Sequence, residues 1–214
     1  NVAGRRAEGF YPRDVILHLF GRLTAEGANF KVIEFHGEAI RAMATSGRLV
    51  LCNMTVEAGA TGGVVPPDEE TVRSLREEAG VTGDPDLFGP DADAVYERVV
   101  EIDGSALEPQ IACPHTVDNV KPVGEVAGTR VHQIVIGSCT NGRLDDIEVA
   151  ARTLHGKKVA RSTRLLVFPA SWRIYSEAMR RGYLQQLLGA GAVVCNPGRG
   201  PGLPVDPGAR GGRG

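Results

Sequence analysis

The stretch VHQIVIGSCTNGRLDDIEVAARTLHG (131–156) decides the fold. Its first seven residues, 131–137, are mostly apolar and predict a buried strand. The residues after it predict a helix, because apolar side chains recur on one helical face at Leu144, Ile147, Ala151 and Leu154. Only a short polar turn separates the two segments. A strand that runs almost directly into a helix is typical of parallel α/β sheets.

The segments that follow repeat this alternation. TRLLVFPAS (163–171) predicts a strand, 172–191 one or two helices, and AVVCNPG (192–198) a strand and a turn. Alternating strands and helices indicate an α/β protein with a doubly wound, mostly parallel sheet, and continuous apolarity indicates that both sheet faces are covered. Ligands bind beyond the carboxyl ends of such strands. We therefore expect Cys139, Ser171 and Asn196 along one cavity rim.

The first half of the chain also predicts helices and strands, but less regularly. We expect helices over 11–27, 37–47, 49–59 and 66–80, strands over 29–35 and 94–103, and an irregular connector over 107–128. The expected domains are a partial first α/β domain at 1–106, a connector at 107–130, a second α/β domain at 131–198 and a disordered Gly/Arg/Pro tail at 199–214.

Composition excludes several classes of function. The formal net charge of −2 gives no reason to expect nucleic acid or an anionic membrane as a partner. No apolar run approaches the roughly 20 residues that span a bilayer, and the first residues lack the apolar core of a signal peptide. The four cysteines are widely scattered, which favours a reduced, cytoplasmic setting over a disulfide framework.

Cys139 admits two interpretations. A free cysteine at a strand end is usually a small buried hydrophobe. Its neighbours Ser138, Thr140 and Asn141 are poor core residues, however, and a thiolate at a helix entrance is stabilised by the helix dipole. Such a thiolate suits a nucleophile or a metal ligand. A hydrolase nucleophile needs a histidine base, and nothing in the sequence places a histidine beside Cys139.

Five segments give the chain a family resemblance. In order they are YPRDVILHLFGRL, FHGEAIRAM, LCNMTVEAGATGGVVPPDEET, LEPQIACPHTVDNVKPV and IGSCTNGRLDD. From about residue 10 to residue 198 the chain resembles the aconitase superfamily, most closely the large subunits of 3-isopropylmalate dehydratases and homoaconitases. The resemblance implies a three-layer α/β/α fold, a [4Fe–4S] cluster and a separate small swivelling subunit. It also implies a hydro-lyase that isomerises a small 2-hydroxy di- or tricarboxylic acid, 2- and 3-isopropylmalate of leucine biosynthesis.

The resemblance also assigns roles to individual residues. Cys139 matches the first of three cysteines that hold the cluster. Glu57 matches a catalytic glutamate of the active-site hydrogen-bond network, and the side chains expected to bind substrate are Asn53, Ser138, Thr140 and Asn141. Without the resemblance, Asn53 and Glu57 at i and i+4 would be interpreted as the solvated face of a helix.

The chain departs from the family pattern after its last predicted strand. The family loop carries two cysteines, but this chain reads NPGRGPG, with Arg199 and Gly202 at those positions. One thiolate cannot hold a cluster whose usual ligation is several cysteines, and Cys195 is the nearest substitute. We therefore expect the chain as written to bind no [4Fe–4S] cluster and to be inactive alone. A frameshift, a truncation or divergence would each explain the departure.

Four interpretations of function follow. The first is a fragment or degenerate large subunit of 3-isopropylmalate dehydratase, and the second is a homoaconitase-type hydratase. The third is a non-catalytic remnant or interaction domain, and the fourth a thiol enzyme that uses Cys139. His115 is expected to have a structural role in the connector.

Overall fold

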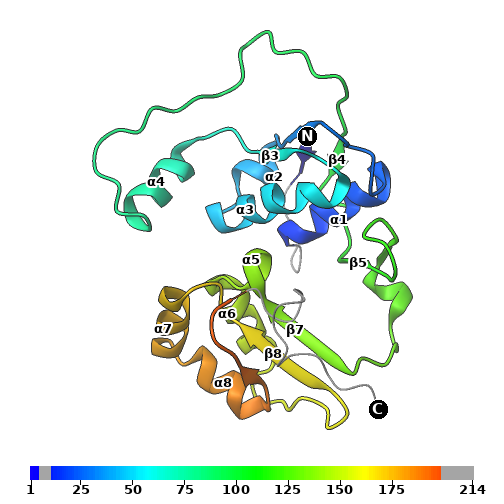
Figure 1. Ribbon diagram of the computed structural model, residues 1–214, viewed down its shortest axis with the longest axis vertical. Coiled ribbons are helices and arrows are strands. Elements are labelled where there is room, and N and C mark those ends of the chain that lie inside the picture. Colours follow the sequence, from blue (N-terminus) through cyan, green and yellow to red (C-terminus); the bar gives the residue numbers. More distant parts are fainter. Residues whose placement is uncertain (5–10, 199–214) are drawn as a thin grey trace. The chain divides into compact units, whose positions relative to one another are not determined.

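The computed structural model describes residues 1–4 and 11–198, which fall into two compact units (Figure 1). The first unit is Asn1–Gly128 and the second is Thr129–Gly214. Each unit is described by itself. The expected tail at 199–214, with positions 199 and 202, lies outside the described residues.

The first unit combines helices with three small sheets. Its helices are α1 (Pro12–Leu23), α2 (Glu38–Arg41), α3 (Thr45–Met54), the 3-10 segment η1 (Thr55–Ala58), α4 (Glu69–Glu77) and the 3-10 segment η2 (Val123–Val126). Two strand pairs are parallel: β1 (Val2–Ala3) with β4 (Ile102–Asp103), and β2 (Val32–Glu34) with β3 (Gly62–Val64). One pair, β5 (Gln110–Ala112) with β6 (Val120–Pro122), is an antiparallel hairpin.

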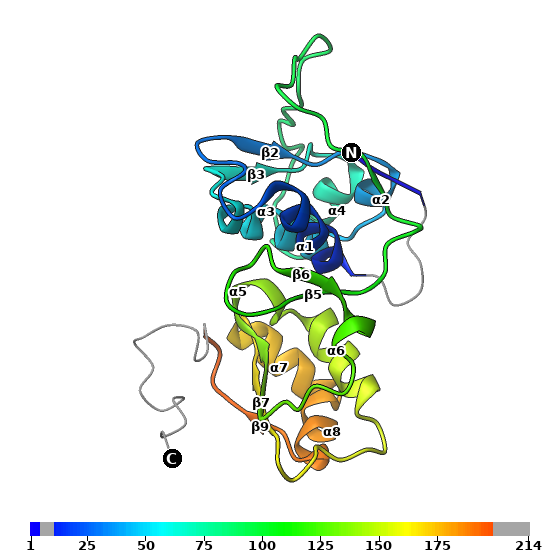
Figure 2. The same cartoon turned by 90° about the vertical axis from the view of Figure 1, so that its right-hand side faces the viewer.

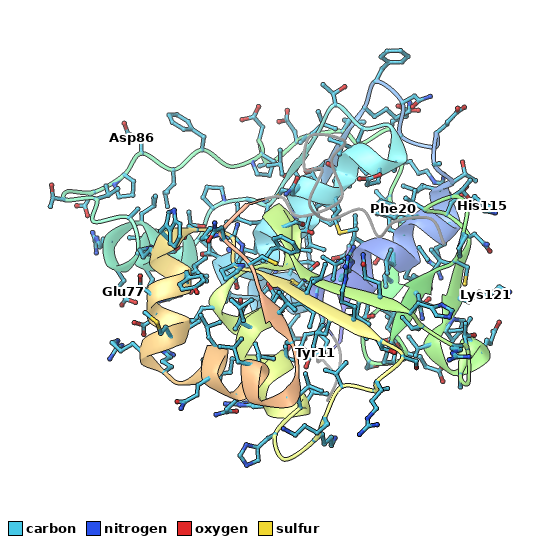
Figure 3. All side chains as sticks on the ribbon, turned by 60° about the horizontal axis from the view of Figure 1, so that its bottom comes forward. Tyr11, Phe20, Glu77, Asp86, His115 and Lys121 are labelled. Atoms are coloured by element: carbon cyan, nitrogen blue, oxygen red, sulfur yellow. The ribbon has the colours of Figure 1, made fainter. Side chains whose placement is uncertain are left out.

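Helix α1 lies at the core of this unit, as the sequence predicts. Pro12 occupies its first turn, where a missing N–H costs nothing, and the apolar face buries Val15, Ile16 and Phe20 completely. Figure 3 labels Phe20 on α1. The helix begins as predicted and ends at Leu23, a few residues before Gly27, which was expected to follow its end.

The stretch predicted as an irregular connector instead forms the β5–β6 hairpin, which packs on α1. The buried Asp14 carboxylate joins the two, because it accepts hydrogen bonds from the backbone N–H of Tyr11 and of Gln110, each at 2.8 Å. Burial raises the pKa of Asp14, and these two backbone hydrogen bonds partly offset the rise. The hairpin therefore belongs to the first unit.

Two further predictions in this unit are wrong. The predicted strand 94–103 is a strand only at Ile102–Asp103, and Val95 is 95% exposed, within a long segment without helix or strand that leaves α4 and returns at β4 (Figure 1). Gly47 does not end a helix. It lies inside α3, where an added Cβ would come within 2.7 Å of Pro12 Cγ, so Gly47 permits the close approach of α3 to α1.

The second unit is a three-stranded parallel α/β unit, as predicted. Its elements are β7 (Gln133–Gly137), α5 (Ser138–Asn141), α6 (Leu144–Thr153), β8 (Arg164–Phe168), α7 (Trp172–Arg180), α8 (Tyr183–Ala190) and β9 (Val193–Val194). The strands pair in the order β7-β8-β9. The predicted helix 172–191 is two helices, because Gly182 adopts a left-handed conformation between them.

The described helices of this unit cover one face of its sheet. Because both crossovers move in the same direction along the sheet, right-handed connections place their helices on the same side. Ile147 of α6, Ala178 of α7 and Leu187 of α8 accordingly share one cluster with Val167 of β8. Figure 2 shows these three helices on one side of β7 and β9. On the opposite face Leu166 is 5% exposed, but its neighbours in register, Val135 and Val193, are 43% and 50% exposed.

Candidate active site

The junction of β7 and α5 is a sharp turn at the carboxyl edge of the sheet. Gly137 has φ 141° and Ser138 has φ 73°, both in the region that favours glycine. An added Cβ on Gly137 would lie 2.2 Å from the carbonyl oxygen of Phe168, the last residue of β8. The turn is thus pressed against the end of β8, and only glycine fits there.

The SCTN motif itself forms the short helix α5 (Figure 1), so Cys139 lies in a separate helical turn and not at the entrance of α6. Ser138 Oγ and Thr140 Oγ1 lie 3.5 Å apart, and both residues are half-buried. This arrangement keeps hydroxyl groups on both sides of Cys139 in the chain. Their predicted roles in binding substrate remain predictions.

Asp146 fixes the turn between α5 and α6. Its carboxylate accepts hydrogen bonds from Asn141 Nδ2 at 3.1 Å and from the backbone N–H of Arg143 at 3.0 Å. Burial raises the pKa of Asp146, and the Asn141 hydrogen bond partly offsets the rise. Both carboxylate oxygens of Asp146 therefore hold the segment after Cys139.

The loop after β8 packs against this turn. The carbonyl of Gly142 accepts a hydrogen bond from the backbone N–H of Ala170 at 2.8 Å, and Ser171 Oγ caps α7 by accepting from the N–H of Ile174. Asn196 follows β9 at the same edge of the sheet, since the three strands are parallel. The strand ends therefore lie on one edge. A common cavity there remains a prediction.

Asn53 and Glu57 lie in the first unit and are both exposed. Asn53 is in the last turn of α3 and Glu57 is in η1, so the predicted continuous helix 49–59 changes to a 3-10 helix at Thr55. Their side chains are accessible, which a substrate contact requires. A site shared with Cys139 remains a prediction. His115, expected to be structural, is exposed and lies in the connection between β5 and β6, on the same side of the view as Lys121 (Figure 3).

Arg143 is a residue that the sequence reasoning passed over. Its Nε atom is buried and has no hydrogen-bond partner among the described residues. It is also the N-cap of α6, the end of a helix where the dipole disfavours a cation. The sequence signal that could have identified Arg143 is a basic residue at the start of a predicted helix.

The donor set does not fit a [4Fe–4S] cluster. Among the side chains that the structure describes, which do not include that of Cys139, no three His, Cys, Asp or Glu residues gather where they could hold a metal. Cys52 and Cys113 are free thiols of the first unit, and burial raises the pKa of Cys52. The sequence has Arg199 and Gly202 where two further cysteine ligands were expected, and the role of Cys139 as a ligand remains a prediction.

No helix in the described part of the chain is long and apolar enough to cross a membrane.

These features define an α/β protein whose polar, cysteine-bearing turn follows a parallel strand. The chain belongs to the Aconitase family (aconitate hydratase), which it matches over residues 1–208.

Its relatives are more particular. It is 47% identical, over 94% of its length, to 3-isopropylmalate dehydratase large subunit 1 of Methanopyrus kandleri. It is 46% identical, over 98% of its length, to the probable methanogen homoaconitase large subunit of Methanosarcina mazei, and 44% identical over 92% to the 3-isopropylmalate dehydratase large subunit of Geobacter sulfurreducens. It covers 47%, 53% and 48% of these relatives, so it spans about half their length.

Proposed function

We propose that the chain contributes to the large subunit of a hydro-lyase of the 3-isopropylmalate dehydratase type, which interconverts 2- and 3-isopropylmalate in leucine biosynthesis. The observation that carries this proposal is the SCTN turn at the carboxyl edge of a parallel sheet, in a chain 47% identical to such a subunit. The partner would be a small, swivelling subunit, and the setting the reducing cytoplasm.

In this proposal each site residue has a role at the substrate. Asn53, Ser138, Thr140 and Asn141 donate hydrogen bonds to the hydroxyl and carboxylate oxygens of a 2-hydroxy acid. Glu57 gives a proton to the departing hydroxyl group, which leaves as water, and takes a proton back from the water that adds in the second step, the work of a general acid–base carboxylate. The exposed positions of Asn53 and Glu57 support access to substrate.

Homoaconitase-type hydration is the second candidate. It is favoured by the Methanosarcina mazei relative, whose printed name is a homoaconitase and which this chain matches at 46% identity over 98% of its length. The two reactions use similar 2-hydroxy acids that differ in the side chain, so activity on each substrate distinguishes them. A non-catalytic remnant is the third candidate, favoured by the lost ligand positions at 199 and 202.

A hybrid enzyme tests the function. Residues 11–198 of this chain replace the matching segment of the Methanopyrus kandleri large subunit, which supplies its own flanking sequence, and the hybrid is assayed with the relative's small subunit. We expect turnover of isopropylmalate that Cys139→Ser abolishes. A hybrid that folds and assembles but acts on neither isopropylmalate nor homoaconitate would favour the remnant.

Cluster uptake is tested on the chain as written. We expect anaerobic reconstitution with iron and sulfide to give no stoichiometric cluster, because Arg199 and Gly202 offer no thiolate. Iron and sulfide analysis and the visible absorption band are the measurements. The matched variant Arg199→Cys/Gly202→Cys should take up cluster and still show no turnover alone. Stoichiometric uptake by the unmodified chain would contradict the prediction and point to Cys195.

A further inference from the structure

We propose that Arg143 binds a carboxylate group of the small dicarboxylic acid substrate at the carboxyl edge of β7 and β8, an inference that rests on the proposed function. Nothing in the family resemblance assigned a role to this residue. The starting observation is that Arg143 Nε is buried without a hydrogen-bond partner among the described residues. A guanidinium stays charged at all physiological pH values, so Arg143 cannot avoid the free-energy cost of removing Nε from water by losing its proton.

An unpaired buried donor is uncommon, because it loses hydration and gains nothing in return. The Asp146 carboxylate does not supply the missing acceptor. Asp146 lies close enough for Arg143 to lower its pKa, but its two oxygens accept from Asn141 Nδ2 and from the Arg143 backbone N–H. Asp146 therefore holds the backbone of Arg143 and leaves Nε for another acceptor.

The position of Arg143 adds a second argument. As the N-cap of the ten-residue helix α6, it places a cation at the positive end of the dipole, which is unfavourable unless an anion is also present. Its neighbour Gly142 is fixed to the β8–α7 loop through the Ala170 N–H, at 2.8 Å. The backbone that carries Arg143 is thus held at the strand ends, where parallel α/β sheets bind ligands.

The chemistry of the ligand follows from the fork of donors. A guanidinium binds a carboxylate with two parallel N–H···O bonds, and Nε takes part in one common form of this pairing. Ser138 and Thr140 lie in the preceding helix of the same chain segment, and their hydroxyl groups supply neutral donors of the kind that a 2-hydroxy acid needs. A small 2-hydroxy dicarboxylate offers a carboxylate for the planar fork of the guanidinium and a hydroxyl group for these neutral donors.

The Nε–Hε resonance of Arg143 tests the proposal directly. The full chain, labelled with ¹⁵N, is titrated with succinate at constant ionic strength, which requires neither turnover nor a cluster. We expect a saturable shift of the Arg143 Nε–Hε signal and of the Gly142 amide. No shift with succinate, or the same shift with chloride, would overturn the proposal. Failure of the hybrid enzyme would leave this result unaffected.

Two variants complete the test. Arg143→Lys keeps the charge but loses the fork, so succinate binding at the Gly142 amide should weaken by about tenfold, the loss of one charge-assisted hydrogen bond. The matched control is Arg180→Lys, because Arg180 lies on the same unit and is already paired with Glu177. Equal weakening in both variants would overturn the proposal. If Arg143→Lys does not fold, the titration of the unsubstituted chain decides.

Discussion

Arg48 shows how this chain satisfies a buried guanidinium. It is 4% exposed and makes four hydrogen bonds: to the carbonyls of Met43 and Arg41 and to both oxygens of Asp68. Asp68 in turn caps α4 by accepting from the N–H groups of Glu70 and Thr71. One cation therefore joins the end of α2, helix α3 and the start of α4. Arg143, with Nε unpaired, is the contrasting case.

Replacing Arg48 should destabilise the first unit. Arg48→Met leaves the Asp68 carboxylate and two carbonyls without their donor, and we expect a loss of about 3 kcal/mol in the free energy of unfolding. Arg73→Met is the control, since Arg73 is exposed in its pairs with Glu70 and Glu77, and should cost much less stability than Arg48→Met. Urea denaturation followed by circular dichroism measures both. Similar losses in the two variants would contradict the prediction.

The same ion pair predicts a pH dependence. The Arg48 hydrogen bonds are the main cause that lowers the pKa of Asp68. A carboxyl with a lowered pKa in the folded state stabilises the fold above its unfolded pKa of about 3.9, and that stability is lost as the pH falls further. We expect the stability difference between the wild type and Arg48→Met to shrink from about pH 5 to about pH 2. A constant difference over this range would contradict it.

At the scale of elements, a helix could be predicted from the sequence where local residues mark its start and its first turn. Helices α1 and α4 were predictable because Pro12 and Asp68 mark their starts and acidic side chains follow in the first turn. The predicted strand at 94–103 failed because β-branched residues alone do not specify a strand without a partner, and pairing reaches only Ile102–Asp103. The prediction that Gly47 ends a helix was wrong, because the need for glycine at this position comes from a tertiary contact with Pro12.

The candidate site divides in the same way. Its place at the end of β7 was predictable, because the apolar strand and the polar turn are adjacent in the sequence. The separate helix α5 and the two acceptor roles of Asp146 were not, since they depend on how tightly the turn packs against Phe168. The unpaired Arg143 Nε could not be predicted either, because its burial depends on tertiary packing and not on a local sequence pattern.

The β7–α5 turn gives the clearest prediction at this scale. Gly137→Ala adds a Cβ at 2.2 Å from the Phe168 carbonyl oxygen, at a φ that alanine avoids, so we expect the second unit to lose at least about 2 kcal/mol. Gly189→Ala, in α8 with open space around it, should instead stabilise the unit by about 0.5–1 kcal/mol. Thermal denaturation of both variants is the measurement, and a stable Gly137→Ala would contradict the turn geometry.

At the scale of the whole chain, the two units have separate cores. One cluster of buried side chains belongs to residues up to Leu107, and the other begins at Ile147. Each unit thus buries its own apolar surface, and the segment between them, with Arg130 exposed, is accessible.

Limited trypsin digestion should show this division. We expect early cleavage after Arg130 and after the exposed Arg98, whereas the buried Arg48 is protected. Mass spectrometry identifies the cuts, and the fragment that begins at residue 131 should keep its helical circular dichroism signal. Rapid cleavage at Arg48, or loss of that signal on cutting at Arg130, would contradict two independent cores.

The segment between α4 and β4 has a consequence for how this protein can be altered. Residues 78–101 contain no helix or strand, so their length is not fixed by any ladder or helical register. The entropy of closing a loop grows only with the logarithm of its length, and doubling this one would cost about 0.6 kcal/mol. Extra sequence, such as an affinity tag or a small fluorescent domain, is therefore best inserted near Gly89, where an added side chain would meet open space.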